Sequence, residues 1–184
     1  MVEFVLVAPV ILVLLLVVAD FARFFATGIA VESAARDAAE VAAQEYLRNP
    51  PAPIGSPAPS PGNPTYYDAI DGYAVSTLCN ELGGQPNAGS DCSAIPMYVC
   101  VHDGADPNCG TVYPASAMVP AGCTSFATPP TDTQTDGTET SRYVEVRVCY
   151  RFSTLFNISN IAGIGTPFGN SYIERDRVFT VADY

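Results

Sequence analysis

Residues 4–19 read FVLVAPVILVLLLVVA, an uncharged run of 16 residues on which the architecture of the chain depends. As a helix this run spans about 24 Å, slightly less than the hydrocarbon core of a bilayer. Pro9 removes one backbone hydrogen bond, which a helix buried among other helices tolerates. Asp20 and Arg23 follow the run three residues apart, so they can pair on one helix face. We therefore predict a membrane-seeking helix that ends in a charge pair, and Pro9, Asp20 and Arg23 are candidate assembly residues on it.

The helical pattern continues beyond this run without a breaker. Residues 29–48, IAVESAARDAAEVAAQEYLR, have strong helix propensity. Glu32, Arg36 and Glu40 form an i,i+4 ladder on a polar face, and small apolar residues occupy the opposite face. We predict one helix over residues 2–48, about 70 Å long.

Alanine recurs at every fourth position of this helix, at 22, 26, 30, 34, 38 and 42. Small residues at this spacing let helix backbones approach closely. Helix propensity alone also explains the alanines, because Ala is the best helix former. Under the packing interpretation, Ala26, Ala30 and Ala34 are candidate assembly contacts.

The charge balance limits the kinds of partner. The chain of 184 residues has a net charge of −11, and its eight basic residues are all Arg. Nucleic acid would require a basic face, so we do not expect it as a partner. The same balance disfavours docking on an anionic membrane surface.

The cysteines indicate an oxidising compartment. The six residues are Cys79, Cys92, Cys100, Cys109, Cys123 and Cys149, all of them outside the N-terminal helix. They form no CxxC pair, which disfavours zinc, and their even number predicts three disulfides. Six cysteines allow 15 connectivities. In the strands that we predict over residues 95–102 and 142–152, Cys100 and Cys149 both fall on the more polar face. This suggests one pairing, Cys100–Cys149.

The rest of the chain divides into a linker and a head. Residues 49–65 hold seven of the sixteen prolines and predict a stiff, extended linker. In the head, residues 66–184, the pattern predicts a short helix over 67–84 and strands over 95–102, 142–152 and 171–181. We expect the last two strands to pair as a meander, and the fold class to be α+β with an antiparallel sheet stapled by disulfides.

No constellation of residues predicts catalysis or a cofactor. His102 is the single histidine, and neither a GxSxG motif nor a phosphate-binding loop is present. Asp103, Asp106 and Asn108 are spaced closely enough for calcium, although an exposed turn has the same composition. The sequon at 157–159 and the Thr-rich residues 124–140 leave glycosylation open. We therefore do not expect an enzyme.

Two quoted stretches resemble a known family. VEFVLVAPVILVLLLVVADFARFF, followed by AARDAAEVAA, is similar to the TadE-like proteins of the tight-adherence (Tad) pilus system. The resemblance lies in the Val-Glu-Phe start, the apolar run with Pro9, the group from Asp20 to Arg23, and the Ala-rich stretch. It covers about the first 45 residues. The strands over 142–152 and 171–181 resemble those that end many such proteins.

The resemblance implies a structural subunit of a type IV pilus. Such subunits are made with a basic leader that a prepilin peptidase removes, wait in the bacterial inner membrane, and are then assembled with other pilin subunits into an extracellular filament. Their N-terminal helices pack in the filament core and the heads face outward. Glu3 then matches the family's near-terminal glutamate, an assembly contact with a neighbouring subunit.

Charge placement agrees with a removed leader. Positive residues normally flank the cytoplasmic side of a span, yet here the nearest one, Arg23, lies on the side of the cysteine-rich head. A cleaved signal peptide is the competing explanation, but ADFARFF is a poor cleavage site. Two other hypotheses remain: a membrane-tethered adhesin or binding head that never polymerises, and an anchored enzyme. Whether the subunit is major or minor stays open.

Overall fold

The computed structural model describes residues 2–48, 64–89, 92, 94–102, 108–109, 122–123, 135–136, 139–140, 143–154 and 171–181. Its elements follow the order α1 (Val2–Arg48), α2 (Pro64–Leu82), β1 (Met97–His102), β2 (Asn108–Cys109), β3 (Thr135–Asp136), β4 (Glu139–Thr140), β5 (Tyr143–Phe152) and β6 (Ser171–Thr180). The predicted α+β class is confirmed. The predicted linker residues 49–63, the possible calcium residues 103–107 and the sequon lie outside the described residues.

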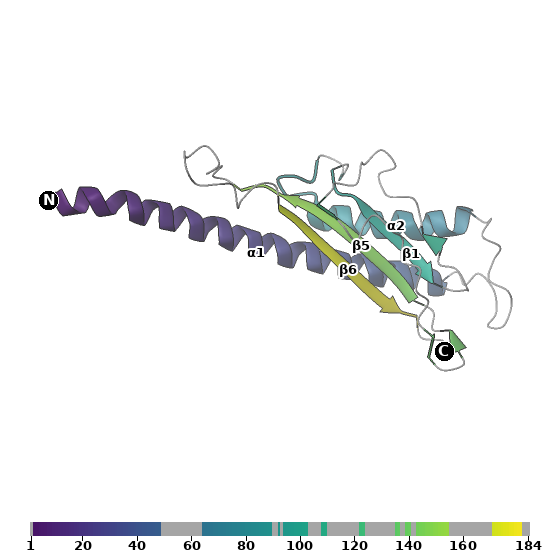
Figure 1. Ribbon diagram of the computed structural model, residues 1–184. Coiled ribbons are helices and arrows are strands. Elements are labelled where there is room, and N and C mark those ends of the chain that lie inside the picture. Colours follow the sequence, from purple (N-terminus) through teal and green to yellow (C-terminus); the bar gives the residue numbers. More distant parts are fainter. Residues whose placement is uncertain are drawn as a thin grey trace.

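Helix α1 forms a rod that extends far beyond the rest of the molecule (Figure 1). It spans 47 residues as predicted, and it continues through Pro9 without a break. Proline costs a helix one backbone hydrogen bond, and the helical residues on both sides of Pro9 tolerate that loss. One element therefore carries both the membrane-seeking run and the Ala-rich stretch.

Helix α2 is longer than predicted at its N-terminal end. It begins at Pro64, two residues before the predicted start of the head, and proline is well suited to the first helical turn. Gly83 ends the helix as predicted, since its backbone N–H donates to the carbonyl of Cys79 at 2.8 Å. A β-carbon at this glycine would lie 2.7 Å from the same carbonyl oxygen, so the close turn requires glycine.

The main sheet is antiparallel, with the strand order β2-β1-β5-β6. The predicted pairing of the last two strands is confirmed, because β5 and β6 pair over their whole length, from Tyr143 opposite Thr180 to Phe152 opposite Ser171. Strand β1 pairs with the other side of β5, and Val99 lies opposite Val146. Strands β3 and β4 form a separate two-stranded ladder.

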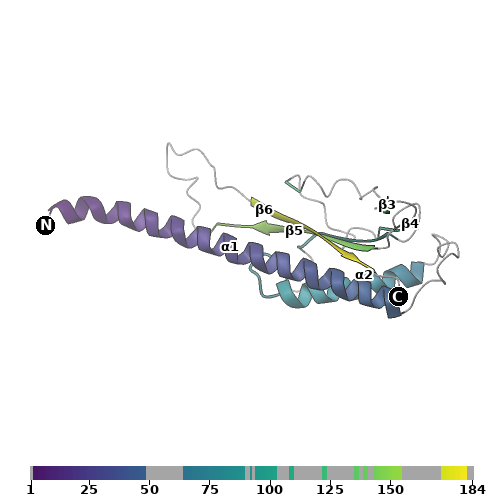
Figure 2. The same ribbon diagram turned by 90° about the horizontal axis from the view of Figure 1, so that it is seen from below.

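Both helices lie on one face of the sheet, which gives two layers (Figure 2). Alternation along the strands directs valines toward the helices, and the α1 residues that meet them are mostly alanines. The C-terminal half of α1 is thus part of the core of the head. The core comprises Val31, Ala34, Ala35, Ala38, Ala42, Ile70, Leu78, Leu82, Met97, Val99, Val144, Val146, Val148 and Tyr150, among others.

Candidate assembly and membrane surface on the N-terminal helix

The first part of α1, residues 4–22, is a rod of exposed apolar side chains, which we call the exposed segment. Each side chain described in it is exposed or half-buried; Phe4 is 75% exposed and Leu15 is 64% exposed. Large apolar residues point in all directions around the helix. A helix that is apolar all round is stable when lipid or other helices surround it. Helix α1 is also long and apolar enough to cross a membrane, and its most apolar window is not buried within the molecule.

The second part, residues 27–46, is the docked segment, because its small apolar face packs on α2, β5 and β6. Val31, Ala34, Ala38 and Ala42 are fully buried there, which confirms the predicted apolar face. Alanine lets the helix axis approach its neighbours closely, and the valines of the sheet fill the remaining space. The docked segment holds the exposed segment in a fixed orientation relative to the head.

The alanine repeat is divided between the two segments. Ala22 and Ala26 are exposed, Ala30 is half-buried, and Ala34 is buried inside the head. Ala34 therefore contributes to the fold of a single chain, a role that the sequence interpretation did not foresee. An assembly role for the exposed alanines stays a prediction.

A neck of residues 23–26 joins the two segments. The predicted Asp20–Arg23 pair is confirmed, with Arg23 Nη1 at 3.4 Å from Asp20 Oδ1. The Arg23 guanidinium also lies over the ring of Phe152, 5.7 Å from its centroid. Phe24 packs against the same ring edge-on, with centroids 5.3 Å apart. The end of β5 thus fixes the neck from the side of the head.

Glu32 fastens the docked segment to the edge strand β6. Its carboxylate pairs with Arg175, whose Nε lies 3.2 Å from Glu32 Oε2, and it accepts hydrogen bonds from Arg177. The sequence suggested a ladder of Glu32 with Arg36 and Glu40, and it missed this clamp. The available signal was the sequence ERDR in β6, because strand alternation directs both arginines to the face that meets α1.

The opposite face of the sheet carries a buried polar cluster. His102 Nε2 donates to Glu145 Oε2 at 3.1 Å, and its ring stacks on Tyr143 with centroids 4.0 Å apart. Arg147 bonds to Glu145 as well, and its Nε lies 3.2 Å from Asp176 Oδ2. His102 is thus a buried structural residue. Nδ1 of its ring has no hydrogen-bond partner within the described part of the chain.

The pKa values of the two carboxyl groups in this cluster, Glu145 and Asp176, are shifted in opposite directions. Burial alone would raise the pKa of Glu145, but the hydrogen bond with His102 and the charge of Arg147 outweigh burial and hold that pKa below its usual value. Burial and the neighbouring Glu145 charge raise the pKa of Asp176 to about 6. Among the described residues, no group of three or more His, Cys, Asp or Glu side chains is arranged to hold a metal ion.

The cysteine pairing differs from the expectation drawn from strand phase. Cys149 bonds to Cys123, with Cα atoms 6.3 Å apart, so the suggested Cys100–Cys149 pair is wrong. The phase was correct, since both residues lie on the outer face, but the partner of Cys149 is Cys123, which packs on that face beside Tyr98 and Tyr172. Gly122 lies against the ring of Tyr172, leaving no room there for a β-carbon.

The remaining cysteines do not complete the three predicted disulfides, because one of them, Cys92, is unbonded in the structure. Cys100 is disulfide-bonded, and Cys109 lies opposite it in the register of β1 and β2. Cys92 is buried with a free thiol. Cys79 is half-buried on α2. Glu3 belongs to α1, but its side chain lies outside the described part of the chain.

Comparison with known proteins supports the interpretation of the N-terminal helix. Residues 1–40 match the family model of TadE-like proteins, a range that contains the exposed segment, the neck and most of the docked segment. No curated protein and no solved structure matches the chain. The predicted resemblance is confirmed for this range, because residues 1–40 match the TadE-like model.

Proposed function

We propose that this chain is a structural, pilin-like subunit of a Tad-type pilus, assembled through residues 1–48 with its head facing outward. The observation that carries the proposal is the exposed segment, a rod of apolar side chains that continues as one helix into the core of the head. The TadE-like match over residues 1–40 supports the same assignment. We assign a structural role because the exposed segment is a surface suited to packing against other helices.

The exposed segment suits two successive environments. Lipid tails accept an all-round apolar helix of this length, and so does a bundle of similar helices. Transfer from one to the other costs little hydrophobic free energy, because both environments are apolar. We therefore place the chain in the bacterial inner membrane first, after removal of a leader by prepilin peptidase, and in an extracellular pilus afterwards.

Rigid docking of α1 favours a filament in which every head has a defined position. The docked segment packs on two strands and a helix, and Glu32 fastens it to β6. Neighbouring exposed segments in a core would therefore impose their regular spacing on the heads. A flexible tether would not transmit that order.

Electron cryo-microscopy of purified filaments tests the proposal. We expect helical density with an apolar core of α1 helices and a head on the outside. Heads along the whole length identify the major subunit, whereas heads at the tip alone identify a minor one. Filaments in which this chain is absent, from cells that display it on the surface, would contradict the proposal.

A matched pair of substitutions separates assembly from simple tethering. Glu3→Ala should abolish incorporation into filaments, because an apolar core leaves a carboxylate only a neighbouring subunit as a partner. Glu81→Ala, at an exposed carboxylate of α2, is the control and should have no effect. If both variants reach the cell surface equally and no filament contains the wild-type chain, the protein is instead a membrane-tethered binding head.

A further inference from the structure

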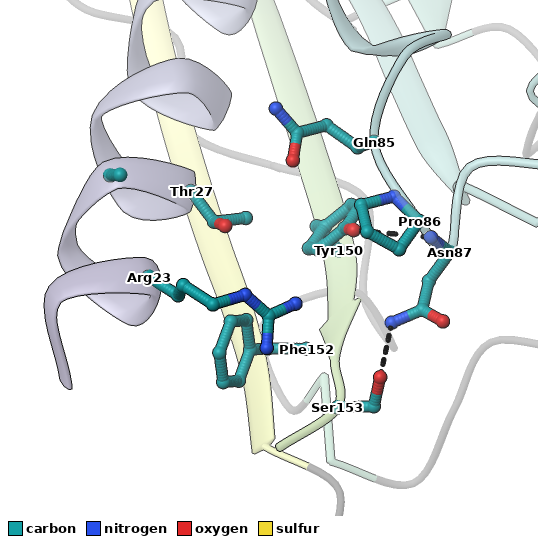
Figure 3. A pocket seen from close by; sticks show the side chains of 9 residues that line it. Arg23, Thr27, Gln85, Pro86, Asn87, Tyr150, Phe152 and Ser153 are labelled. Carbon is teal, nitrogen blue, oxygen red and sulfur yellow. Dashed lines mark hydrogen bonds between the residues drawn. The ribbon is translucent and has the colours of Figure 1, made fainter. Parts of the chain in front are cut away.

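A pocket of about 270 Å³ lies at the neck, where α1 meets the head. Arg23 and Thr27 line it from α1, Asn87 from the loop after α2, and Phe152 and Ser153 from the end of β5. Figure 3 shows Arg23 reaching from the helix across Phe152 toward Asn87. The pocket thus combines one cation, several neutral polar groups and aromatic rings.

Hydrogen bonds fix the wall of this pocket before any ligand binds. The side-chain amide of Asn87 donates to Ser153 Oγ at 3.0 Å (Figure 3). It also donates to the carbonyl oxygen of Arg151 at 2.8 Å. Its backbone N–H donates to the hydroxyl of Tyr150 at 3.3 Å. The loop is therefore held on β5, and a ligand need not order it.

The position of the pocket along α1 points to the class of ligand. Arg23 follows Phe4 by 19 residues, which is about 28 Å of helix. This length matches the hydrocarbon core of a bilayer, about 30 Å thick. When the exposed segment crosses the membrane, Arg23 and the pocket beside it lie at the level of the lipid headgroups.

We propose that this pocket binds the headgroup of a zwitterionic phospholipid while the chain resides in the membrane. The phosphate is bound by the Arg23 guanidinium, which offers five N–H donors and uses one nitrogen for Asp20. Asp20 cancels the charge of Arg23 locally and the whole chain carries −11, so a headgroup without net charge fits better than an anionic one.

The proposal rests only on the membrane residence in the proposed function, and not on filament assembly. A bound lipid would hold the head against the membrane surface and set the depth of α1 before extraction. Assembly would then require release of this lipid, since neighbouring helices replace the bilayer around the exposed segment.

Native mass spectrometry of the full-length chain in detergent tests the proposal. We expect one retained molecule of phosphatidylethanolamine per chain, and weaker retention of phosphatidylglycerol. Arg23→Gln should reduce the retained fraction about tenfold, the usual effect of losing a hydrogen bond to a charged group. Arg36→Gln, at an exposed arginine on the same helix, should retain lipid like the wild type.

A second pair of variants distinguishes loss of the pocket from misfolding of the chain. Ala26 lines the pocket but is exposed, so Ala26→Phe should fill the pocket without disturbing the core. Ala22→Phe, one turn earlier and also exposed, leaves the pocket open. Loss of lipid in Ala26→Phe alone supports the proposal, and equal retention in both variants overturns it.

The remaining outcomes identify other occupants. Displacement of the lipid by millimolar inorganic phosphate would show a site for free phosphate, which contradicts the proposal. Unchanged lipid retention in Arg23→Gln together with lost filament incorporation would assign the pocket to a neighbouring subunit. Lost lipid retention with normal filaments would support the lipid site and leave the assembly proposal untouched.

Discussion

The exposed and docked segments of α1 belong to one helix, yet they meet opposite surroundings. Large residues such as Phe4 and Leu15 surround the exposed segment on all sides, and the single chain completely covers none of the side chains that the structure describes there. Small residues line one face of the docked segment, and the sheet and α2 bury that face completely. Residue size and periodicity therefore distinguish a helix surface that meets other molecules from one that packs in the chain's own core.

Removal of the Cys123–Cys149 bond should produce the largest difference between the segments. The bond closes a loop of 26 residues, and a loop of this size stabilises a fold by about 3 kcal/mol. Cys149→Ser should lower the free energy of unfolding of the head by that amount, measured by denaturant titration in detergent. The docked segment should melt with the head, whereas the exposed segment should stay helical by circular dichroism. Equal loss of helix in both segments would remove the distinction between them.

Overpacking of the docked segment should have the second largest effect on the stability of the head. Ala34→Leu adds three carbons at a fully buried position and should destabilise the head by about 1–3 kcal/mol. Ala22→Leu, in the same alanine repeat but exposed, should leave the melting temperature of the head unchanged. If the two variants unfold alike, the division of the repeat is wrong. Filament yield of Ala22→Leu then tests close packing between subunits.

Loss of the Glu32 clamp should have a smaller effect. Glu32, Arg175 and Arg177 are each more than a third exposed, and such pairs contribute at most about 1 kcal/mol. Glu32→Gln should therefore lower head stability slightly, and added salt should reduce the difference from wild type. Glu40→Gln on the same helix is the control. A difference that persists at 1 M salt would mean that Glu32 acts through packing rather than charge.

The smallest expected effect is a dependence of head stability on pH through Asp176, because its side chain is 46% exposed and solvent screens its interactions. Its pKa is about 6 in the folded chain, against an ordinary value of 3.8 for an aspartate. The folded chain therefore holds the proton more tightly than the unfolded chain, and this group lowers stability as the pH rises from about 4 to 6. Asp176→Asn should gain stability relative to wild type across that window. A constant difference between the two melting curves from pH 4 to 6.5 would contradict this.

The low pKa of Glu145 changes the stability of the head with pH in the opposite direction, and it does so at lower pH. Its charged form is favoured in the folded chain, so its contribution is present above its unfolded pKa and is lost as the pH falls. The comparison of wild type with Asp176→Asn isolates Asp176 because Glu145 is common to both proteins.

Periodic patterns predicted most of the fold correctly. The bounds of α1, the positions of β1, β5 and β6, and the antiparallel pairing of the last two strands all followed from local residue order. The predicted Asp20–Arg23 pair is likewise local, because the two residues are one turn apart. Such features depend on helix and strand geometry, which a few neighbouring residues determine.

Apart from the N-terminal bound of α2 and the short strands β2, β3 and β4, the errors and omissions involve residues far apart in the chain. Strand phase placed Cys149 on the correct face but could not identify Cys123 as its partner. The clamp of Glu32 joins residues 145 positions apart, and the lipid pocket draws on three separate elements. No local pattern encodes which segment crosses a given face of a sheet.

The long helix with its all-apolar end follows from residue order alone, because hydrophobicity and helix propensity are properties of consecutive residues. Where that helix stops being a surface for other molecules and becomes part of the head depends on how the chain packs. The division falls at the neck, where Phe152 from the end of β5 packs against Phe24. Burial is a property of the folded arrangement, so alanines of the same repeat have different roles on the two sides of the neck: Ala22 is exposed and Ala34 is buried in the core.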